Sequence, residues 1–88
     1  MTGVEIANRA REQLVWITGL EAGTLTRLAR EDDGWHVNVD LVELKRIPST
    51  TDVLATYEAV LDDEGNLLRH QRLRRYLRAD VTDGHEHA

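Results

Sequence analysis

Four histidines are the residues best able to bind a metal or carry a proton, and two of them stand together as His85-Glu86-His87. Two imidazoles and one carboxylate in a polar terminal segment bind a metal weakly, because nothing there fixes their geometry. The sequence therefore predicts no metal centre. His36 and His70 stand apart, on the polar faces of two predicted strands, where we expect both to be solvated.

Nucleophiles and phosphate loops are equally sparse. Ser49-Thr50-Thr51-Asp52 sets hydroxyls beside a carboxylate, but no histidine lies nearby to act as base, so a polar turn explains it. The acidic clusters at 31–33 and 62–64 lack the alternating oxygen ligands of a calcium loop. No cysteine is present, which excludes disulfides and thiolate chemistry. We predict a protein without catalytic activity or cofactor; the weakest alternative is a small enzyme that uses Asp52 and Tyr57.

Arginines are concentrated in one segment of an acidic chain. The formal net charge is −5, yet residues 67–78 hold five arginines and no acid. Arginine forms bidentate contacts with carboxylates and is enriched at protein interfaces. Two other interpretations remain open: a charged edge strand that prevents aggregation, and pairing across the sheet with Glu58, Asp40 and Glu43. Nucleic-acid binding is not expected, because the chain is acidic and only Tyr76 interrupts the arginines.

Alternation along this segment assigns its side chains to two faces. Leu73 and Leu77 are an even number of residues apart and so lie on the same face of the predicted strand. We expect that face to meet the core and the other face to point outward. The outward set would be Arg72, Arg74 and Tyr76, with Arg69 and Arg75 near the margins of the sheet. The predicted partner-binding residues are therefore Arg72, Arg74, Tyr76, Arg69 and Arg75.

A helix is predicted over residues 4–19. Thr2 is a suitable N-cap with Glu5 in capping-box position, and Gly19 suits a left-handed C-terminal residue. The expected apolar stripe consists of Val4, Ala7, Ala10, Leu14 and Ile17. Trp16 lies off this stripe, and its role stays open.

Alternating patterns after residue 24 predict four strands, at 24–31, 35–41, 53–61 and 67–77. Turns are expected at 32–34 and 62–66, and the phase change at 41–42 predicts a β-bulge. The expected core is Trp35, Val37, Val39, Tyr57, Ala59, Leu14 and Ile17. The predicted fold is α+β, with one N-terminal helix packed on a four-stranded antiparallel β-meander. We expect one domain at 1–78 and a flexible acidic, histidine-containing tail at 79–88.

The chain has 88 residues, too few for a second domain. No apolar run approaches the roughly 18 residues of a membrane span. The first residues lack the basic-then-apolar pattern of a signal peptide, so we expect a cytoplasmic protein.

A combination of short motifs resembles one family. These motifs are Gly34-Trp35, Glu43-x-x-Arg46-Ile47-Pro48, Asp52-x-Leu54-Ala55-x-Tyr57-Glu58 and Arg74-Arg75-Tyr76. Together with a leading helix that ends at Thr18-Gly19 and with Gly65-Asn66-Leu67-Leu68, the chain resembles the gas vesicle synthesis protein GvpO family over about residues 4–78.

The resemblance implies an accessory protein of gas vesicle assembly with no known catalytic residues. Its partners would be other gas vesicle proteins, such as the shell protein or an AAA-type ATPase, and it could be associated with the vesicle. The oligomeric state stays open. The helix-then-strands order is also similar to small PepSY-type domains, which suggests a binding or inhibitory domain acting on an enzyme or peptide as the alternative. That second likeness concerns the fold alone.

Overall fold

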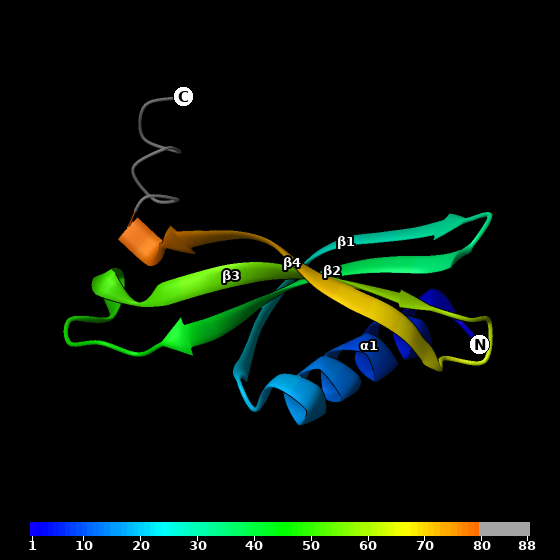
Figure 1. Ribbon diagram of the computed structural model, residues 1–88, viewed down its shortest axis with the longest axis horizontal. Coiled ribbons are helices and arrows are strands. Elements are labelled where there is room, and N and C mark those ends of the chain that lie inside the picture. Colours follow the sequence, from blue (N-terminus) through cyan, green and yellow to red (C-terminus); the bar gives the residue numbers. More distant parts are fainter. Residues whose placement is uncertain (80–88) are drawn as a thin grey trace.

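The structure is a computed structural model that describes residues 1–79. Its elements are α1 (Gly3–Thr18), β1 (Glu21–Glu31), β2 (Gly34–Leu44), a short 3-10 turn η1 (Ser49–Thr51), β3 (Val53–Leu61) and β4 (Leu67–Leu77). The strands pair antiparallel in the order β1-β2-β3-β4, and α1 lies across one face of the sheet (Figure 1). This confirms the predicted α+β meander. The expected flexible tail lies, from residue 80 onward, outside the described residues.

Both ends of α1 carry the caps that the sequence predicted. The Thr2 hydroxyl accepts a hydrogen bond from the Glu5 backbone, and the Glu5 carboxylate accepts one from the Thr2 backbone. Gly19 ends the helix with a φ of 72°. Such reciprocal capping satisfies backbone N–H groups that have no partner within the helix.

The predicted apolar stripe of α1 is wrong at its ends. Ile6, Ala10 and Leu14, spaced four residues apart, are the buried residues of the helix. Val4 is exposed, and Ile17 is 49% exposed although it follows the same stripe. The stripe that faces the sheet runs from Ile6 to Leu14, and Ile17 in the last turn of the helix is half exposed.

The core lies between α1 and the middle strands. Ile6, Ala10 and Leu14 pack on fully buried residues of β2 and β3, with Trp35 and Tyr57 at the border. The β2 and β3 members of this cluster are Val37, Val39, Leu41, Ala59 and Leu61. The predicted core is therefore confirmed for Val37, Val39, Ala59 and Leu14, whereas Trp35 and Tyr57 are only partly buried and Ile17 is half exposed.

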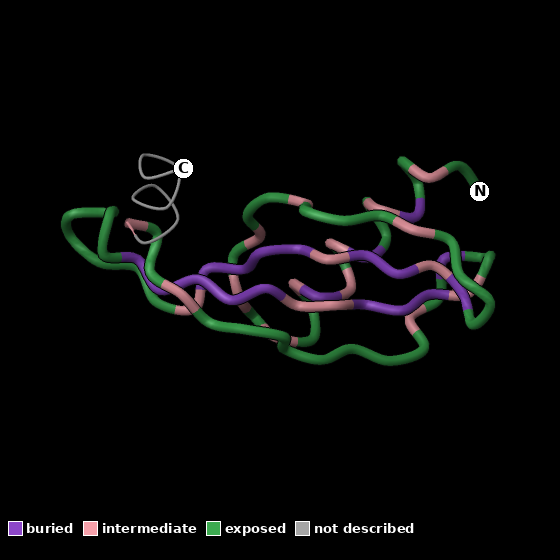
Figure 2. Tube along the Cα trace, turned by 90° about the horizontal axis from the view of Figure 1, so that it is seen from above, coloured by how far each residue is buried: buried purple, intermediate pink, exposed green. Residues whose placement is uncertain are grey.

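The opposite face of β2 and β3 is also covered, although no second layer lies on it. Val60, Leu54 and Val42 there are at most 7% exposed, and His36, Asp40 and Thr56 are buried beside them. Buried residues run along both central strands, whereas the edge strands are mostly exposed (Figure 2). The prediction of a solvated polar face, with a solvated His36, is therefore wrong. Long side chains from the edge strands lie across this face and shield it.

Five irregularities interrupt the strand register. Glu43 is the extra residue of β2, so the predicted bulge is present but lies one residue beyond the expected position at 41–42. β1 is irregular between Ala22 and Leu25 and again before Arg27. In β4, Leu68 and Leu73 have no partner in the register. Bulges bend a strand and prevent its free edge from pairing regularly with a strand of another chain. Both edges of this sheet are interrupted in this way.

Candidate interaction surface on strand β4

The bulge at Leu73 distributes the arginines of β4 differently from the simple alternation. Arg72 pairs with Tyr57 and Arg75 with Ala55, which places both arginines on the face that α1 covers. Arg74 pairs with Thr56 and Arg69 with Val60, on the opposite face. The prediction that Arg72, Arg74 and Tyr76 share one face is therefore wrong. One extra residue in a strand moves every later side chain to the opposite face of the sheet from the one that simple alternation predicts.

On the α1 side, Arg72 and Arg75 share a single carboxylate. Arg75 Nε lies 2.9 Å from Glu43 Oε1, and Arg72 Nη1 lies 3.3 Å from Glu43 Oε2. The Tyr57 hydroxyl donates to the same carboxylate at 3.1 Å. Burial and this carboxylate both raise the pKa of Tyr57. We call Glu43, Arg72 and Arg75 the Glu43 cluster.

On the opposite face, Tyr76 fixes a buried carboxylate. Its hydroxyl donates to Asp40 Oδ2 at 2.5 Å, and the Thr56 hydroxyl donates to Asp40 Oδ1 at 2.7 Å. Burial and the bond to Asp40 raise the pKa of Tyr76 to about 12. Arg74 lies 4.8 Å above the Tyr76 ring, a cation–π distance. A shallow hollow of about 460 Å³ opens beside this group.

Further along the same face, a polar network surrounds His36. Its Nε2 lies 2.6 Å from Asp33 Oδ1 and its Nδ1 lies 3.2 Å from Glu58 Oε2. The hydrogen bond with Asp33 and then that with Glu58 raise the pKa of His36. Hydrogen bonds from His36 and then Arg69 lower the pKa of Asp33 to about 2.

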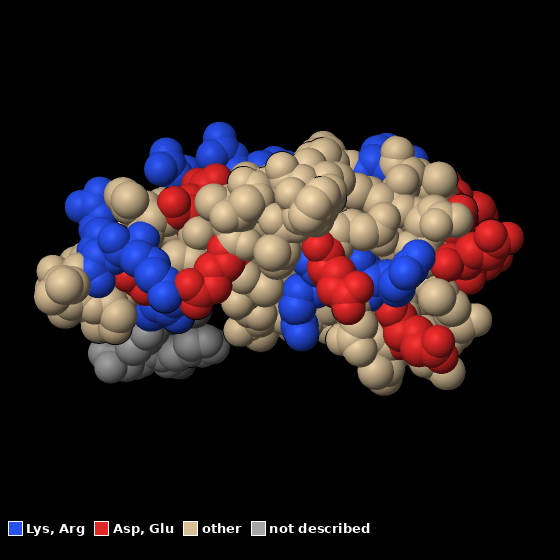
Figure 3. Space-filling view, turned by 90° about the horizontal axis from the view of Figure 1, so that it is seen from below, with Lys and Arg blue, Asp and Glu red and all other residues tan. Residues whose placement is uncertain are grey.

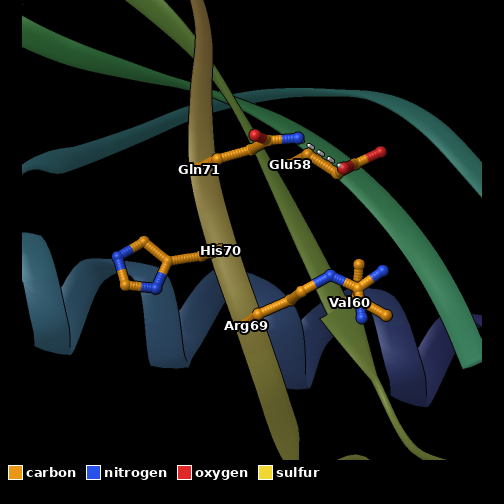
Figure 4. A pocket seen from close by; sticks show the side chains of 5 residues that line it. All are labelled: Glu58, Val60, Arg69, His70 and Gln71. Carbon is orange, nitrogen blue, oxygen red and sulfur yellow. Dashed lines mark hydrogen bonds between the residues drawn. The ribbon is translucent and has the colours of Figure 1, made fainter.

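Figure 4 shows how β4 completes this network. Gln71 donates to Glu58 at 3.1 Å, and Arg69 extends on the same side toward Val60, while His70 points away from both. Burial alone would raise the pKa of Glu58, but the bonds from His36 and Gln71 outweigh it, and the pKa is lowered. His70 is exposed, as predicted.

Comparison with known proteins identifies the family. The profile of the family "Gas vesicle synthesis protein GvpO" matches residues 1–82. The chain belongs to the GvpO family. It is 41% identical over 75 residues to "Gas vesicle protein O" of Streptomyces sp. (strain CB03234), an alignment that covers 85% of this chain and 59% of that relative.

Two further relatives have lower identity. The chain is 34% identical over 76 residues to "Gas vesicle protein O" of Haloferax mediterranei, covering 85% of this chain and 54% of the relative. It is 31% identical over 75 residues to "Gas vesicle protein O1" of Halobacterium salinarum, an alignment that covers 85% of this chain and 63% of that relative. The chain thus spans little more than half the length of these relatives. No solved structure matches it.

The intramolecular pairing of the arginines in residues 67–78 that the sequence left open is found, with one of the three expected acids and with two others. Of the three expected acids, only Glu43 pairs with arginines of β4; Asp40 binds Tyr76, and Glu58 binds Gln71. Asp33 pairs with Arg69, and Asp52 pairs with Arg78 at 3.2 Å. The bulges and turns that bring these acids to β4 change the register, so a count of residues could not find them.

The other candidate residues do not assemble into a site. Asp52 accepts from the Arg46 backbone at 2.8 Å, whereas Tyr57 binds Glu43, so the two are held by separate partners. Within residues 1–79, no group of three metal-binding side chains converges. His85-Glu86-His87 lies outside this range. None of the helices in the described part of the GvpO-family chain has the length and apolar character to cross a bilayer.

Proposed function

We propose that this chain is a cytoplasmic accessory protein of gas vesicle synthesis that works by binding other gas vesicle proteins rather than by catalysis. Family membership supports the gas vesicle role and favours it over the PepSY-like alternative. The observation that supports binding is β4, an exposed strand with four arginines in a chain of net charge −5.

The ion pairs of β4 leave their arginines available. The side chains of Arg69, Arg72 and Arg75 are 50–58% exposed even in their salt bridges. A pair exposed on both sides, such as Arg69–Asp33, contributes about 0–1 kcal/mol to stability, so a partner carboxylate can compete for Arg69 at little cost to the fold. Glu43 is only 14% exposed, so a partner would share the exposed sides of Arg72 and Arg75 rather than displace Glu43.

Deletion of the gene in a vesicle-forming host tests the role. We expect the deletion strain to lose vesicles in electron micrographs and the wild-type gene to restore them. Complementation with a variant in which Arg69, Arg72, Arg74 and Arg75 are Gln should fail. The control is Arg9→Gln with Arg30→Gln, which changes two exposed arginines outside β4 and should restore vesicles.

Affinity capture tests the mechanism. A tagged wild-type chain from vesicle-forming cells should retain at least one further gas vesicle protein, and the β4 variant should lose it. Normal vesicles in the deletion strain would contradict the role. Equal capture by the wild type and the β4 variant would contradict binding through this strand.

A further inference from the structure

The helix α1 leaves one end of its sheet face uncovered. Leu44, Val53 and Leu77 form one row across β2, β3 and β4 on the α1 side. Leu44 is 44% and Leu77 40% exposed. In Figure 1, α1 runs under the end of the sheet that carries the two hairpin turns, and the end near η1 extends beyond it.

Further apolar side chains are exposed on β4 and in the last turn of α1. Leu73, the extra residue of the β4 bulge, is 47% exposed. Ile17 lies on the sheet-facing stripe of α1 yet is half exposed, and its neighbour Trp16 is 88% exposed. Apolar residues that follow the core face but remain in water mark a surface able to bury more.

The same region carries an unbalanced charge. Two guanidinium groups share the one carboxylate of Glu43, which is itself only 14% exposed. Both arginines are at least half exposed, so the Glu43 cluster presents one positive charge beyond what Glu43 neutralises. An external carboxylate would restore the balance and could bind in the bidentate way that arginine favours.

The opposite face of β4 lacks these properties. Arg74 stacks on Tyr76, and Arg69 is bound to Asp33. Leu54 and Val60, the apolar residues that pair with Tyr76 and Arg69, are buried. The acids Asp33 and Glu58 make the surroundings of Arg69 unfavourable for a further carboxylate.

We propose that the Glu43 cluster together with Leu44, Leu73 and Leu77 is the docking surface, and that its occupant is an acidic amphipathic helix of a gas vesicle protein. This rests on the proposed function and specifies the face and the partner's chemistry. A helix fits better than a strand, because bulges interrupt both sheet edges whereas α1 already shows that this face packs a helix. Apolar side chains of the partner would cover the leucines, and its carboxylates would reach Arg72 and Arg75.

Site-specific photo-crosslinking in vesicle-forming cells tests the location. A photoreactive residue replaces Leu73 or Leu77 in the full chain, and Leu68, which is 54% exposed at the other bulge of β4, is the matched control position. We expect positions 73 and 77, and not 68, to crosslink to an acidic amphipathic segment of a gas vesicle protein. Crosslinks only to a second copy of this chain would overturn the proposal.

Two charge reversals on the same strand test the face. Arg72→Glu with Arg75→Glu removes the positive charge on the α1 side, and Arg69→Glu with Arg74→Glu makes the same change in charge on the opposite face. Crosslinking at position 77 should fall at least about tenfold in the first variant, the equivalent of about 1.4 kcal/mol, and change little in the second. A second test covers the case in which the charge reversal impairs folding. It combines Leu44→Ser with Leu77→Ser and measures crosslinking from a photoreactive residue at position 73, which should also fall.

These outcomes separate this inference from the proposed function. Capture of gas vesicle proteins that depends only on Arg69 and Arg74 would overturn the docking surface and leave the role of β4 intact. If both charge-reversal variants still capture gas vesicle proteins, that result would contradict binding through β4 as a whole. Dependence on Arg72 and Arg75, with crosslinks at 73 and 77, supports both.

Discussion

Gly34 holds the turn between β1 and β2 in a conformation that a side chain would oppose. Its φ is 131°, and a Cβ built there would lie 2.4 Å from the Leu61 carbonyl oxygen. Gly19 also has a positive φ, of 72°, but no atom lies within 4 Å of its Cβ position. Substituting Gly19 therefore measures the cost of the left-handed backbone alone, whereas substituting Gly34 adds the cost of a steric clash.

The first prediction compares alanine substitutions at these two positions. Gly19→Ala should lower the free energy of unfolding by about 1 kcal/mol, because only the left-handed backbone penalises it. Gly34→Ala should lower it by a further 1–3 kcal/mol or so, since β2 must also move away from β3. Urea denaturation measures both. Equal losses would show that the approach of Gly34 to Leu61 is not constrained.

His36 makes the stability of the fold depend on pH. The folded pKa lies above the unfolded value of about 6.5, so protonated His36 stabilises the fold fully below that pH. This stabilisation is lost as the pH rises through the folded pKa. Asp33 behaves oppositely: its contribution is present above its unfolded pKa of about 3.9 and is lost as the pH falls through about 2.

The second prediction is a maximum of stability between about pH 4 and pH 6.5, where both groups are charged. Between pH 6.5 and 8 the free energy of unfolding should fall in the wild type and stay nearly flat in His36→Gln. The exposed His70→Gln is the control and should keep the wild-type slope. Urea denaturation across this range decides the matter, and identical slopes in wild type and His36→Gln would contradict the role of the network.

At the scale of the element, α1 is held by one stripe of residues. Ile6 is fully buried against the sheet, whereas Val4, two residues earlier, is 71% exposed. The third prediction is that Ile6→Ala costs about 2–5 kcal/mol and Val4→Ala less than about 0.5 kcal/mol. Thermal or urea unfolding measures both. A larger loss for Val4→Ala would restore the stripe that the sequence predicted and contradict the packing of α1.

Local signals predicted the ends of the elements well. The capping box at Thr2 and Glu5, the left-handed Gly19 and the turn glycine Gly34 each depend on a few neighbouring residues, and each is found where expected. The alternation from Trp35 to Leu41 predicted the core face of β2 for the same reason.

Positions that depend on register were not predictable in the same way. A count along β4 from Leu77 gives the correct faces for Tyr76, Arg75 and Arg74 and the wrong face for Arg72 and Arg69, because Leu73 intervenes. Nothing in the residues around Leu73 indicates a bulge, whereas the phase change at Val42 did. The sequence left open a pairing of Glu43 with these arginines, but which arginines it binds, and the pairing of Asp33 with Arg69, depend on these shifts in register.

At the scale of the whole molecule, acids are more numerous near the hairpin turns and bases near η1, although ion pairs such as Arg30–Asp63 and Lys45–Glu21 put both signs at each end. Both hairpin turns, with acids such as Asp32 and Glu64, lie at one end of a molecule that is 39 Å long. Lys45, Arg75 and Arg78 lie toward the other end, near η1. Figure 3 shows mainly basic side chains at one end of the face seen from below and mainly acidic ones at the other, with side chains of the other sign among them. The net charge of −5 therefore does not describe the field at either end.

The fourth prediction follows from this separation. At 0.1 M salt the screening length is about 10 Å, so an acidic partner at the Glu43 cluster is shielded from the distant turns. Asp32→Asn with Glu64→Gln should then change the affinity less than twofold. At 0.01 M the screening length is about 30 Å, comparable to the molecule, and the same substitutions should raise the association rate by reducing repulsion.

Stopped-flow association with the crosslinked partner at the two salt concentrations measures this effect. Arg72→Glu with Arg75→Glu is the reference, because a change at the contact itself should weaken binding at both concentrations. An equal effect of the turn substitutions at both concentrations would mean that the partner contacts the turns directly. Binding would then extend over the acidic end, and the assignment of the docking surface to the uncovered end of the sheet would fail.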